Sequence, residues 1–299
     1  MEKVRVELNP TYKLKGGFAR PLQILPWLQN VEEISVVANS DVPPLSIVVN
    51  NRIVAVVDPF DEPGLDSPWD DSSTLQRIQE LKPRLILKYQ WRRGVDYPPG
   101  TISAGYPCAE DIDRPPDLLT RNRPLAITAR MRADGDYHWA TNKDWMIART
   151  ALVYQARLLR HLGHATRCGF TGNDQYISEL WDTQVGFEWR GCGYLTHRLI
   201  EYIRAGVVPL TRPLGRQWPI REDVILEDGV HCVFCPDPYR FAQEASKLLL
   251  DQQKIARIRR NLAKLWEEKL CPKAQGYWLW SKIKNASTDY TESVYNNQL

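Results

Sequence analysis

A strand–helix alternation that runs through the first half of the chain and restarts in the second half is the feature that most constrains the fold. In the first half, apolar strand segments at 52–58 and 84–88 flank a helix expected at 72–82. The pattern restarts with a strand at 124–130 and a strongly amphipathic helix at 143–163. Alternating strands and helices form parallel sheets with helices on both faces. The sequence therefore predicts an α/β fold of two Rossmann-like domains, whose parallel sheets face a cleft.

The two runs are separated by residues 109–123, which are rich in Pro, Asp and Arg and lack apolar periodicity. We therefore expect an amino-terminal Rossmann-like domain over residues 1–117 and a carboxy-terminal one over 118–270. Residues 271–299 contain the aromatic run "GYWLW", which needs a surface on which to be buried. We expect this tail to pack back on the amino-terminal domain.

The sequence also predicts one tight connection between two strands. The segment "LSIVV-NN-RIVAVVD" places Asn50 and Asn51 between two apolar strands. Asparagine tolerates the left-handed dihedral angles of a tight hairpin. The sequence therefore predicts a hairpin at this pair.

Composition narrows the classes of function without choosing one. The chain has 299 residues, of which 43% are hydrophobic and 25% charged, as in ordinary globular proteins. Its net charge of +3 suits anionic small molecules but does not by itself indicate a nucleic-acid binder. No apolar run approaches the ~18 residues of a membrane span, and the amino terminus lacks a signal-peptide core. We expect a cytoplasmic protein with no membrane span, whose six scattered cysteines are reduced.

The stretch "GCGYLTHRLIEYIRAGVVPL", residues 191–210, has the composition of an anion-binding turn and helix. Gly191 and Gly193 allow a tight turn, and a helix that begins at Tyr194 offers free backbone N–H groups. In open parallel sheets, ligands bind where such helix termini meet the carboxyl ends of strands. The stretch therefore predicts a phosphate site.

Two charged side chains of the same stretch extend this hypothesis. Arg198 can make a bidentate contact to a phosphate, and Glu201, one turn later, can accept hydrogen bonds from two hydroxyls of a ribose. An Arg198–Glu201 ion pair on a solvated helix face is the alternative interpretation.

The pattern Gly-x-x-x-x-Arg-x-x-Glu, followed by "AGVVPL" and "LEDGVHCVF", resembles the donor-binding half of glycosyltransferases with the two-domain GT-B architecture. It is most similar to the exostosin-like and family-4-like groups, over about residues 124–270. The resemblance implies transfer of a sugar from a nucleotide sugar, UDP- or GDP-linked, to an acceptor hydroxyl. It gives the ribose to Glu201 and the diphosphate to Arg198, with Gly206 and Pro209 in the strand connection that follows.

One departure from the family pattern limits the mechanism. Many retaining members have a second glutamate eight positions before the ribose-binding one, and Gly193 occupies that position here. The resemblance therefore assigns neither retention nor inversion of the anomeric centre.

Further candidate residues follow strands in both halves. Arg130 comes just after "LAITA", where the family places a phosphate contact. In the first half, "VVDPFDEPG" and "LILKYQWRRG" are similar to a segment of bacterial and viral relatives. Asp58, Asp61 and Glu62 would supply a base towards the acceptor hydroxyl, and an acidic surface turn is the alternative. Lys88 would meet the donor phosphates or an acidic acceptor, and a solvated basic loop is the alternative.

The motif "HCVFC" brings His231, Cys232 and Cys235 together, but a structural zinc site needs a fourth ligand. We expect core cysteines and no metal here. We also expect no cofactor besides the donor, because Arg198, Arg130 and the helix terminus can neutralise a departing diphosphate.

Two other functions remain compatible with the same residues. The acceptor is open between a small molecule, a glycan and DNA, and some phage glycosyltransferases modify DNA bases. A non-catalytic protein of the same fold would keep the nucleotide pocket and use its aromatic and basic surface to hold a glycan or a nucleic acid. Turnover of the donor distinguishes an enzyme from such a binding protein.

Overall fold

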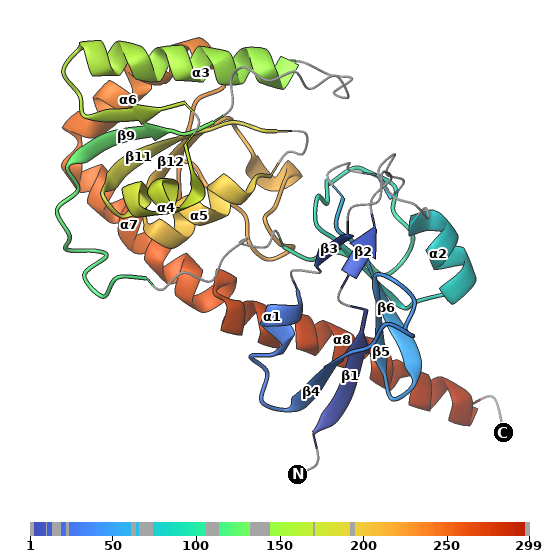
Figure 1. The fold of residues 1–299 in the computed structure, drawn as a ribbon. Helices are drawn as coiled ribbons and strands as arrows, with labels where there is room; N and C mark the ends of the chain where they lie inside the picture. Colours follow the sequence, from blue (N-terminus) through green and yellow to red (C-terminus); the bar gives the residue numbers. More distant parts are fainter. Residues whose placement is uncertain are drawn as a thin grey trace. The chain divides into compact units, whose positions relative to one another are not determined.

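The computed structural model describes residues 3–9, 11–13, 19–21, 24–60, 64–65, 74–105, 114–131, 144–169, 171–191 and 195–296. The chain forms two compact units, which are described separately. The first unit comprises Met1–Ala109, Pro219–Val224 and Lys269–Leu299, and the second comprises Glu110–Trp218 and Ile225–Glu268. Figure 1 shows that each unit has its own sheet and helices. In the described part of the chain, no helix is long and apolar enough to cross a membrane.

The sheet of the first unit has the strand order β4-β1-β5-β6-β7-β8. Its strands are β1 (Val4–Leu8), β4 (Ile34–Ala38), β5 (Ser46–Val49), β6 (Arg52–Asp58), β7 (Leu85–Lys88) and β8 (Thr101–Ser103). A small antiparallel pair is formed by β2 (Thr11–Lys13) and β3 (Ala19–Pro21). The helices are α1 (Leu25–Leu28), α2 (Thr74–Leu81) and α8 (Pro272–Asn296).

The predicted hairpin at Asn50 and Asn51 is confirmed. These residues have φ angles of 50° and 60°, in the left-handed region that asparagine tolerates, and they join β5 to β6. A two-residue connection can join only antiparallel strands. As a result, β5 is antiparallel to both β1 and β6, while β1 is parallel to β4, and β6, β7 and β8 are parallel to one another. The first sheet is therefore rich in parallel strands but not wholly parallel.

The long helix α8 packs against α1 within the first unit (Figure 1). At the contact, a Cβ built on Gly276 would lie 2.1 Å from the carbonyl oxygen of Trp27, so only glycine permits this approach. Next to it on α8, Gln275 is also buried. The aromatic segment at 276–280 thus lies on a helix whose apolar side chains Leu279 and Trp280 are buried.

The segment Pro219–Val224 joins the first unit through a buried arginine. Arg221 donates to both carboxylate oxygens of Asp223 at 2.5 and 2.9 Å, to the carbonyl oxygen of Lys269 at 2.8 Å and to Gln275 Oε1 at 2.7 Å. Its guanidinium carbon also lies 4.5 Å from the centre of the Trp278 ring, a cation–π contact. One side chain therefore fastens this segment to the start of α8.

The sheet of the second unit is wholly parallel. Its strands are β9 (Leu125–Ala129), β10 (Thr166–Cys168), β11 (Thr183–Glu188), β12 (Val208–Thr211) and β13 (Val233–Phe234), in the order β10-β9-β11-β12-β13. Among the described residues of this unit, the α-helices are α3 (Asp144–His161), α4 (Asn173–Trp181), α5 (His197–Ala205), α6 (Phe241–Leu250) and α7 (Gln252–Leu265). Shorter helical turns are Gly215–Gln217 and Pro238–Arg240, and a further turn, Trp266–Leu270, spans the point at Lys269 where the chain passes to the first unit.

Close packing fixes α5 against this sheet. A Cβ built on Gly186 in β11 would lie 2.4 Å from the ring of Tyr202, so the missing side chain makes room for that ring. The Tyr202 hydroxyl donates to the carbonyl oxygen of Phe187 at 3.1 Å. The predicted α/β class with two sheets rich in parallel strands is confirmed, and the cleft stays a prediction.

Candidate functional site

The strand order of the second sheet indicates where a ligand would bind. Numbered along the chain within this unit, the order β10-β9-β11-β12-β13 is 2-1-3-4-5, as in flavodoxin-like folds. The direction of connection reverses between β9 and β11. In such sheets ligands bind outside the carboxyl ends of the strands at this switch point. Here those ends are Ala129, followed by Arg130, and Glu188.

The amino terminus of α5 lies at this edge of the sheet. Thr196 is the N-cap residue: its hydroxyl accepts from the backbone N–H of Leu199 at 3.3 Å and donates to Glu188 Oε1 at 2.8 Å. The helix ends at Gly206, whose φ of 62° is the left-handed C-cap conformation that glycine adopts without strain. The cap and the stop therefore define the helix, and the cap ties its first turn to the end of β11.

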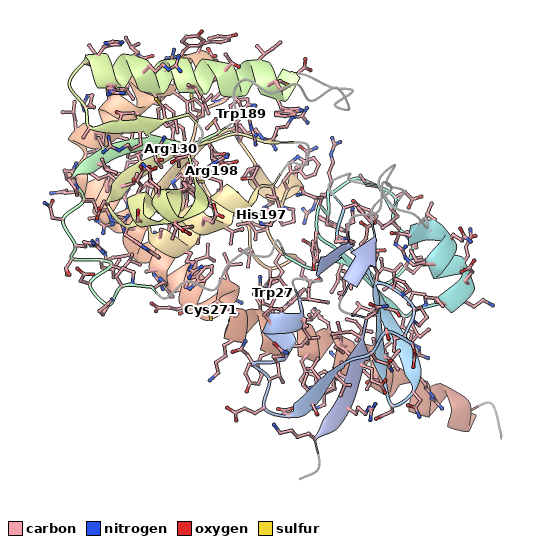
Figure 2. The ribbon with its side chains drawn as sticks, viewed as in Figure 1. Trp27, Arg130, Trp189, His197, Arg198 and Cys271 are labelled. Carbon is pink, nitrogen blue, oxygen red and sulfur yellow. The ribbon has the colours of Figure 1, made fainter. Side chains whose placement is uncertain are left out.

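Arg198 occupies the switch point itself. Its Nε donates to the carbonyl oxygen of Arg130 at 3.0 Å, and its Nη1 lies 3.3 Å from Glu188 Oε2. Figure 2 shows Arg198 and Arg130 next to each other in this unit. The side chain of Arg198 is 15% exposed and that of Glu188 is 4% exposed. Burial is the largest single effect and opposes the charge on Arg198, but Glu188 together with Tyr202, Tyr176 and Glu201 outweighs burial and holds the pKa of Arg198 above its ordinary value.

Arg130 lies close by, but its guanidinium faces another partner. It forms a bidentate ion pair with Glu179 of α4, with Nε–Oε2 and Nη2–Oε1 distances of 2.9 and 2.7 Å. Its Nη1 donates to the carbonyl oxygen of Cys168 at the end of β10. The structure thus brings Arg130 to the predicted edge, and its phosphate contact stays a prediction.

Glu201 lies one turn into α5 and contacts α4. Its Oε2 accepts a hydrogen bond from the hydroxyl of Tyr176 at 2.8 Å. Burial, together with the negative charge of Glu201, raises the pKa of Tyr176 well above its ordinary value. Tyr176 therefore stays protonated at neutral pH and can donate to this carboxylate, and the ribose contact of Glu201 stays a prediction.

Four of the predicted residues lie outside the described part of the chain. These are Gly193 and Tyr194 in the turn before α5, and Asp61 and Glu62 after β6. Within the described part, Leu195 and Thr196 directly precede α5, which begins at His197. The helix that we expected from Tyr194 thus starts three residues later, because Thr196 supplies the cap.

The first unit has its own polar cluster at the carboxyl ends of β6, β7 and β8. Asp58, Lys88 and Ser103 lie in register on these strands, and each is at most 1% exposed. Lys88 Nζ lies 3.0 Å from Asp58 Oδ1 and 3.0 Å from the carbonyl oxygen of Phe60. Burial raises the pKa of Asp58, although Lys88 acts in the opposite direction. The predicted base and the predicted cation are thus paired with each other.

The "HCVFC" motif lies along β13. Cys232 and Cys235 are buried, and their thiols face the carbonyl oxygens of Glu227 and Asp237. Burial raises the pKa of both thiols, which disfavours the thiolate that zinc requires. Among the described residues, the structure has no group of three side chains of the kind that hold a metal ion.

Sequence reasoning missed the residues that position Arg198. Glu188 ends a strand at the switch point, and Thr196 stands directly before the apolar pattern of α5 as an N-cap residue does. The capping signal of Thr196 is present in the sequence, whereas Glu188 can be found only after β11 has been recognised as a strand. Tyr176 and Glu179 gave no comparable signal, because their partners are more than twenty residues away along the chain.

Comparison with known proteins gives structural similarities only. No protein-family model and no curated protein sequence matches the chain. Similar solved structures include a TarM variant from S. aureus in complex with UDP, with 10% identity and a TM-score of 0.46, covering 77% of this chain and 50% of that one. The pneumococcal O-GlcNAc transferase GtfA in complex with UDP and GlcNAc has 15% identity and a TM-score of 0.45, with coverages of 78% and 52%.

A third similar structure is HepE from Anabaena in complex with UDP and glucose. It has 11% identity and a TM-score of 0.42, and the similarity covers 71% of this chain and 65% of that one. The chain spans about half the length of the first structures that it matches. These similarities assign no role to any residue of the chain.

Proposed function

We propose that this chain is a glycosyltransferase that binds the diphosphate of a nucleotide sugar at the carboxyl edge of β9 and β11. The observation that carries the proposal is the position of Arg198. It is the arginine of the Gly-x-x-x-x-Arg-x-x-Glu pattern, and it lies in the first turn of α5 at the switch point of a parallel sheet. Among the described residues its Nη2 has no hydrogen-bond partner, so this nitrogen is left to contact a ligand.

In the proposed reaction, the bond between the sugar and the diphosphate breaks while an acceptor hydroxyl attacks the anomeric carbon. Negative charge grows on the departing diphosphate. Fixed donors aimed at that charge lower the barrier, because they need no reorganisation during the reaction. Arg198 and the amino terminus of α5 supply such donors. Glu188 acts as a positioning residue, because it holds both Thr196 and Arg198.

Glu201 is proposed to bind the hydroxyls of the donor ribose. Its position one turn after Arg198 matches the spacing between a diphosphate and a ribose contact in the pattern. In the unliganded arrangement Tyr176 donates to the same carboxylate, so the ribose would share Glu201 with this hydroxyl. A carboxylate has about four acceptor positions, so the hydrogen bond from Tyr176 does not by itself exclude the ribose hydroxyls.

Two carboxylates that end or follow β6 in the sequence are candidates for the base on the acceptor side. Asp58 is a candidate base at the end of β6, but it is buried and paired with Lys88. Asp61 is the other candidate and lies outside the described residues. We propose that one of these two carboxylates accepts the proton of the acceptor hydroxyl. Asp58→Asn and Asp61→Asn each test this by single-turnover transfer, with donor binding as the control.

Calorimetric titration of UDP and of GDP tests the donor site. A hydrogen bond to a charged group contributes about 1.5–3 kcal/mol, so Arg198→Ala should raise the Kd about 10- to 150-fold. Glu201→Ala should also weaken binding. Arg260→Ala is the matched control, since Arg260 is an exposed arginine on α7, and its Kd should equal that of the wild type. Unchanged affinity in both Arg198→Ala and Glu201→Ala would remove the donor site from α5.

Turnover separates an enzyme from a binding protein. We expect slow hydrolysis of a UDP- or GDP-linked sugar in water, and the absence of both hydrolysis and transfer would leave only nucleotide binding. Activity should persist in EDTA, because we propose that cationic side chains replace a metal. The EDTA experiment is needed because Asp-x-Asp pairs, whose carboxylates could bind a divalent cation, occur in the sequence. These pairs are Asp111 with Asp113 and Asp134 with Asp136, and they lie outside the described residues. Steeply salt-dependent DNA binding would favour DNA as the acceptor.

A further inference from the structure

Helix α4 contacts two of the charged side chains in the proposed donor site. The hydroxyl of Tyr176 donates to Glu201 Oε2 at 2.8 Å, and Glu179, one turn further along α4, forms the bidentate ion pair with Arg130. Figure 1 shows α4 beside α5, and the two helices pack against each other. The orientations of Glu201 and Arg130 therefore depend on side chains of a helix to which neither belongs.

Packing fixes the position of the Tyr176 hydroxyl. The Tyr176 ring lies against a buried cluster of residues from α4, α5 and the connection to β12, namely Leu180, Tyr202, Ala205 and Val207. A tyrosine side chain has two rotatable bonds, so packing of the ring also places the hydroxyl. The terminal torsion of a glutamate is broad, so a carboxylate without partners has no strongly preferred plane. The hydrogen bond from Tyr176 therefore restricts the plane of the Glu201 carboxylate.

We propose that Tyr176 is a positioning residue, through which the donor site selects ribonucleotides over 2′-deoxyribonucleotides. The inference rests on the proposed contact between Glu201 and the donor ribose. A carboxylate that is already ordered can accept from both ribose hydroxyls without the entropy cost of being ordered on binding. A site built in this way discriminates against an analogue that lacks one hydroxyl, because an acceptor is then left unpaired. Tyr176 acts only through Glu201 and does not contact the nucleotide.

The packing of Tyr176 favours this role over competition with the ribose. A competitor would have to release Glu201 when the nucleotide binds. The Tyr176 hydroxyl cannot withdraw far, because its ring is part of the contact between α4 and α5. It uses one acceptor position of a carboxylate that has about four. The two roles predict opposite effects of removing the hydroxyl, since loss of a competitor would strengthen nucleotide binding.

Calorimetric titration of the full chain with UDP and 2′-deoxy-UDP, repeated with GDP and 2′-deoxy-GDP, tests the proposal. In the wild type, the Kd of the deoxynucleotide should exceed that of the ribonucleotide about 10- to 150-fold, as expected for a lost hydrogen bond to a charged group. Tyr176→Phe keeps the ring and removes only the hydroxyl. It should lower this ratio about three- to tenfold by weakening the ribonucleotide, because Glu201 must then be ordered on binding.

Two control variants separate positioning from a general effect on the fold. Tyr202→Phe removes a buried hydroxyl that donates to the carbonyl oxygen of Phe187 and not to Glu201, so it should keep the wild-type ratio even if it lowers stability. Tyr154→Phe changes a tyrosine on α3 that is 61% exposed, and both Kd values should equal those of the wild type. In a Glu201→Gln background, Tyr176→Phe should change the ratio no further, because the two residues act as one unit.

Three results would overturn this proposal alone. The first is a ratio in Tyr176→Phe that stays within twofold of the wild-type ratio. The second is tighter UDP or GDP binding by Tyr176→Phe, which would make the tyrosine a competitor of the ribose. The third is an equal fall of the ratio in Tyr202→Phe, which would assign the effect to looser packing of α5.

Failure of the proposed donor site gives a different result and would overturn both proposals. In that case the wild type binds neither UDP nor GDP, or Glu201→Ala binds the ribonucleotide and the deoxynucleotide as the wild type does.

Discussion

Replacing Arg221 by alanine should destabilise the first unit selectively. Arg221 is 2% exposed, and its guanidinium makes four hydrogen bonds, two of them to Asp223. Without the Arg221 guanidinium, Gln275 Oε1 and the carbonyl oxygen of Lys269 each lose a hydrogen-bond donor. Breaking a buried ion pair costs about 3–5 kcal/mol. Because the Asp223 side chain is 34% exposed, solvent recovers part of this loss, and we expect about 2–4 kcal/mol.

A matched pair in the same unit provides the control. Arg5 also pairs with a carboxylate two residues later, Glu7, but the Arg5 side chain is 62% exposed. Arg5→Ala should therefore cost about 0–1 kcal/mol. The two substitutions remove the same side chain from pairs of the same sequence spacing, so their difference isolates the effect of burial and of the additional hydrogen bonds of Arg221.

Hydrogen exchange read by mass spectrometry is the suitable assay, because it reports the stability of each unit separately. A loss of about 2–4 kcal/mol corresponds to exchange that is about 30- to 1000-fold faster. In Arg221→Ala this acceleration should appear in peptides from β1, β6 and α8 and not in peptides from β9 and β11. Rates within a few-fold of those of Arg5→Ala, or equal acceleration in both units, would refute the reasoning.

Three further predictions concern single positions. The hydrogen bonds from Arg221 and Lys269 outweigh burial and lower the pKa of Asp223 to about 2. The stabilisation by the Asp223 carboxylate is therefore complete above about pH 4 and is lost towards pH 2. In urea unfolding, the difference in the free energy of unfolding between wild type and Asp223→Asn should narrow over that range. Gly186→Ala should cost about 1–3 kcal/mol in urea unfolding by crowding the neighbouring tyrosine ring, and no loss would contradict the close contact. Lys88→Met should cost about 3–5 kcal/mol of unfolding free energy, because it leaves Asp58 buried without its cation. Adding Asp58→Leu should restore most of the lost stability. A double variant that is no more stable than Lys88→Met would contradict the pairing.

Local signals predicted those elements whose cause is local. The hairpin at Asn50 and Asn51 was predicted because the backbone there needs a residue that tolerates positive φ. The helix expected at 143–163 is α3, which ends just before Gly163, whose φ of 90° lies in the left-handed region. Asp251 separates α6 from α7, since its side chain caps α7 by accepting from the N–H of Lys254. Asp at this position is itself an N-cap signal in the sequence.

Elements with distant causes were not predicted. The strand β11 was missed because Gln184 and Gly186 interrupt its apolar pattern, although packing of the Tyr202 ring requires that glycine. For the same reason Glu188, at the end of β11, was not a candidate. The partners of Arg130 and Glu201 on α4 also depend on how the helices pack, which spacing along the chain does not encode.

A structure of the protein with bound UDP tests the central claim most directly. We predict that the diphosphate lies at the carboxyl edge of β9 and β11, with its oxygens about 2.7–3.2 Å from the guanidinium of Arg198 and facing the amino terminus of α5. The ribose hydroxyls should then lie within hydrogen-bond distance of Glu201. A diphosphate bound elsewhere on the chain, with Arg198 contacting only Glu188 and the carbonyl oxygen of Arg130, would contradict the account.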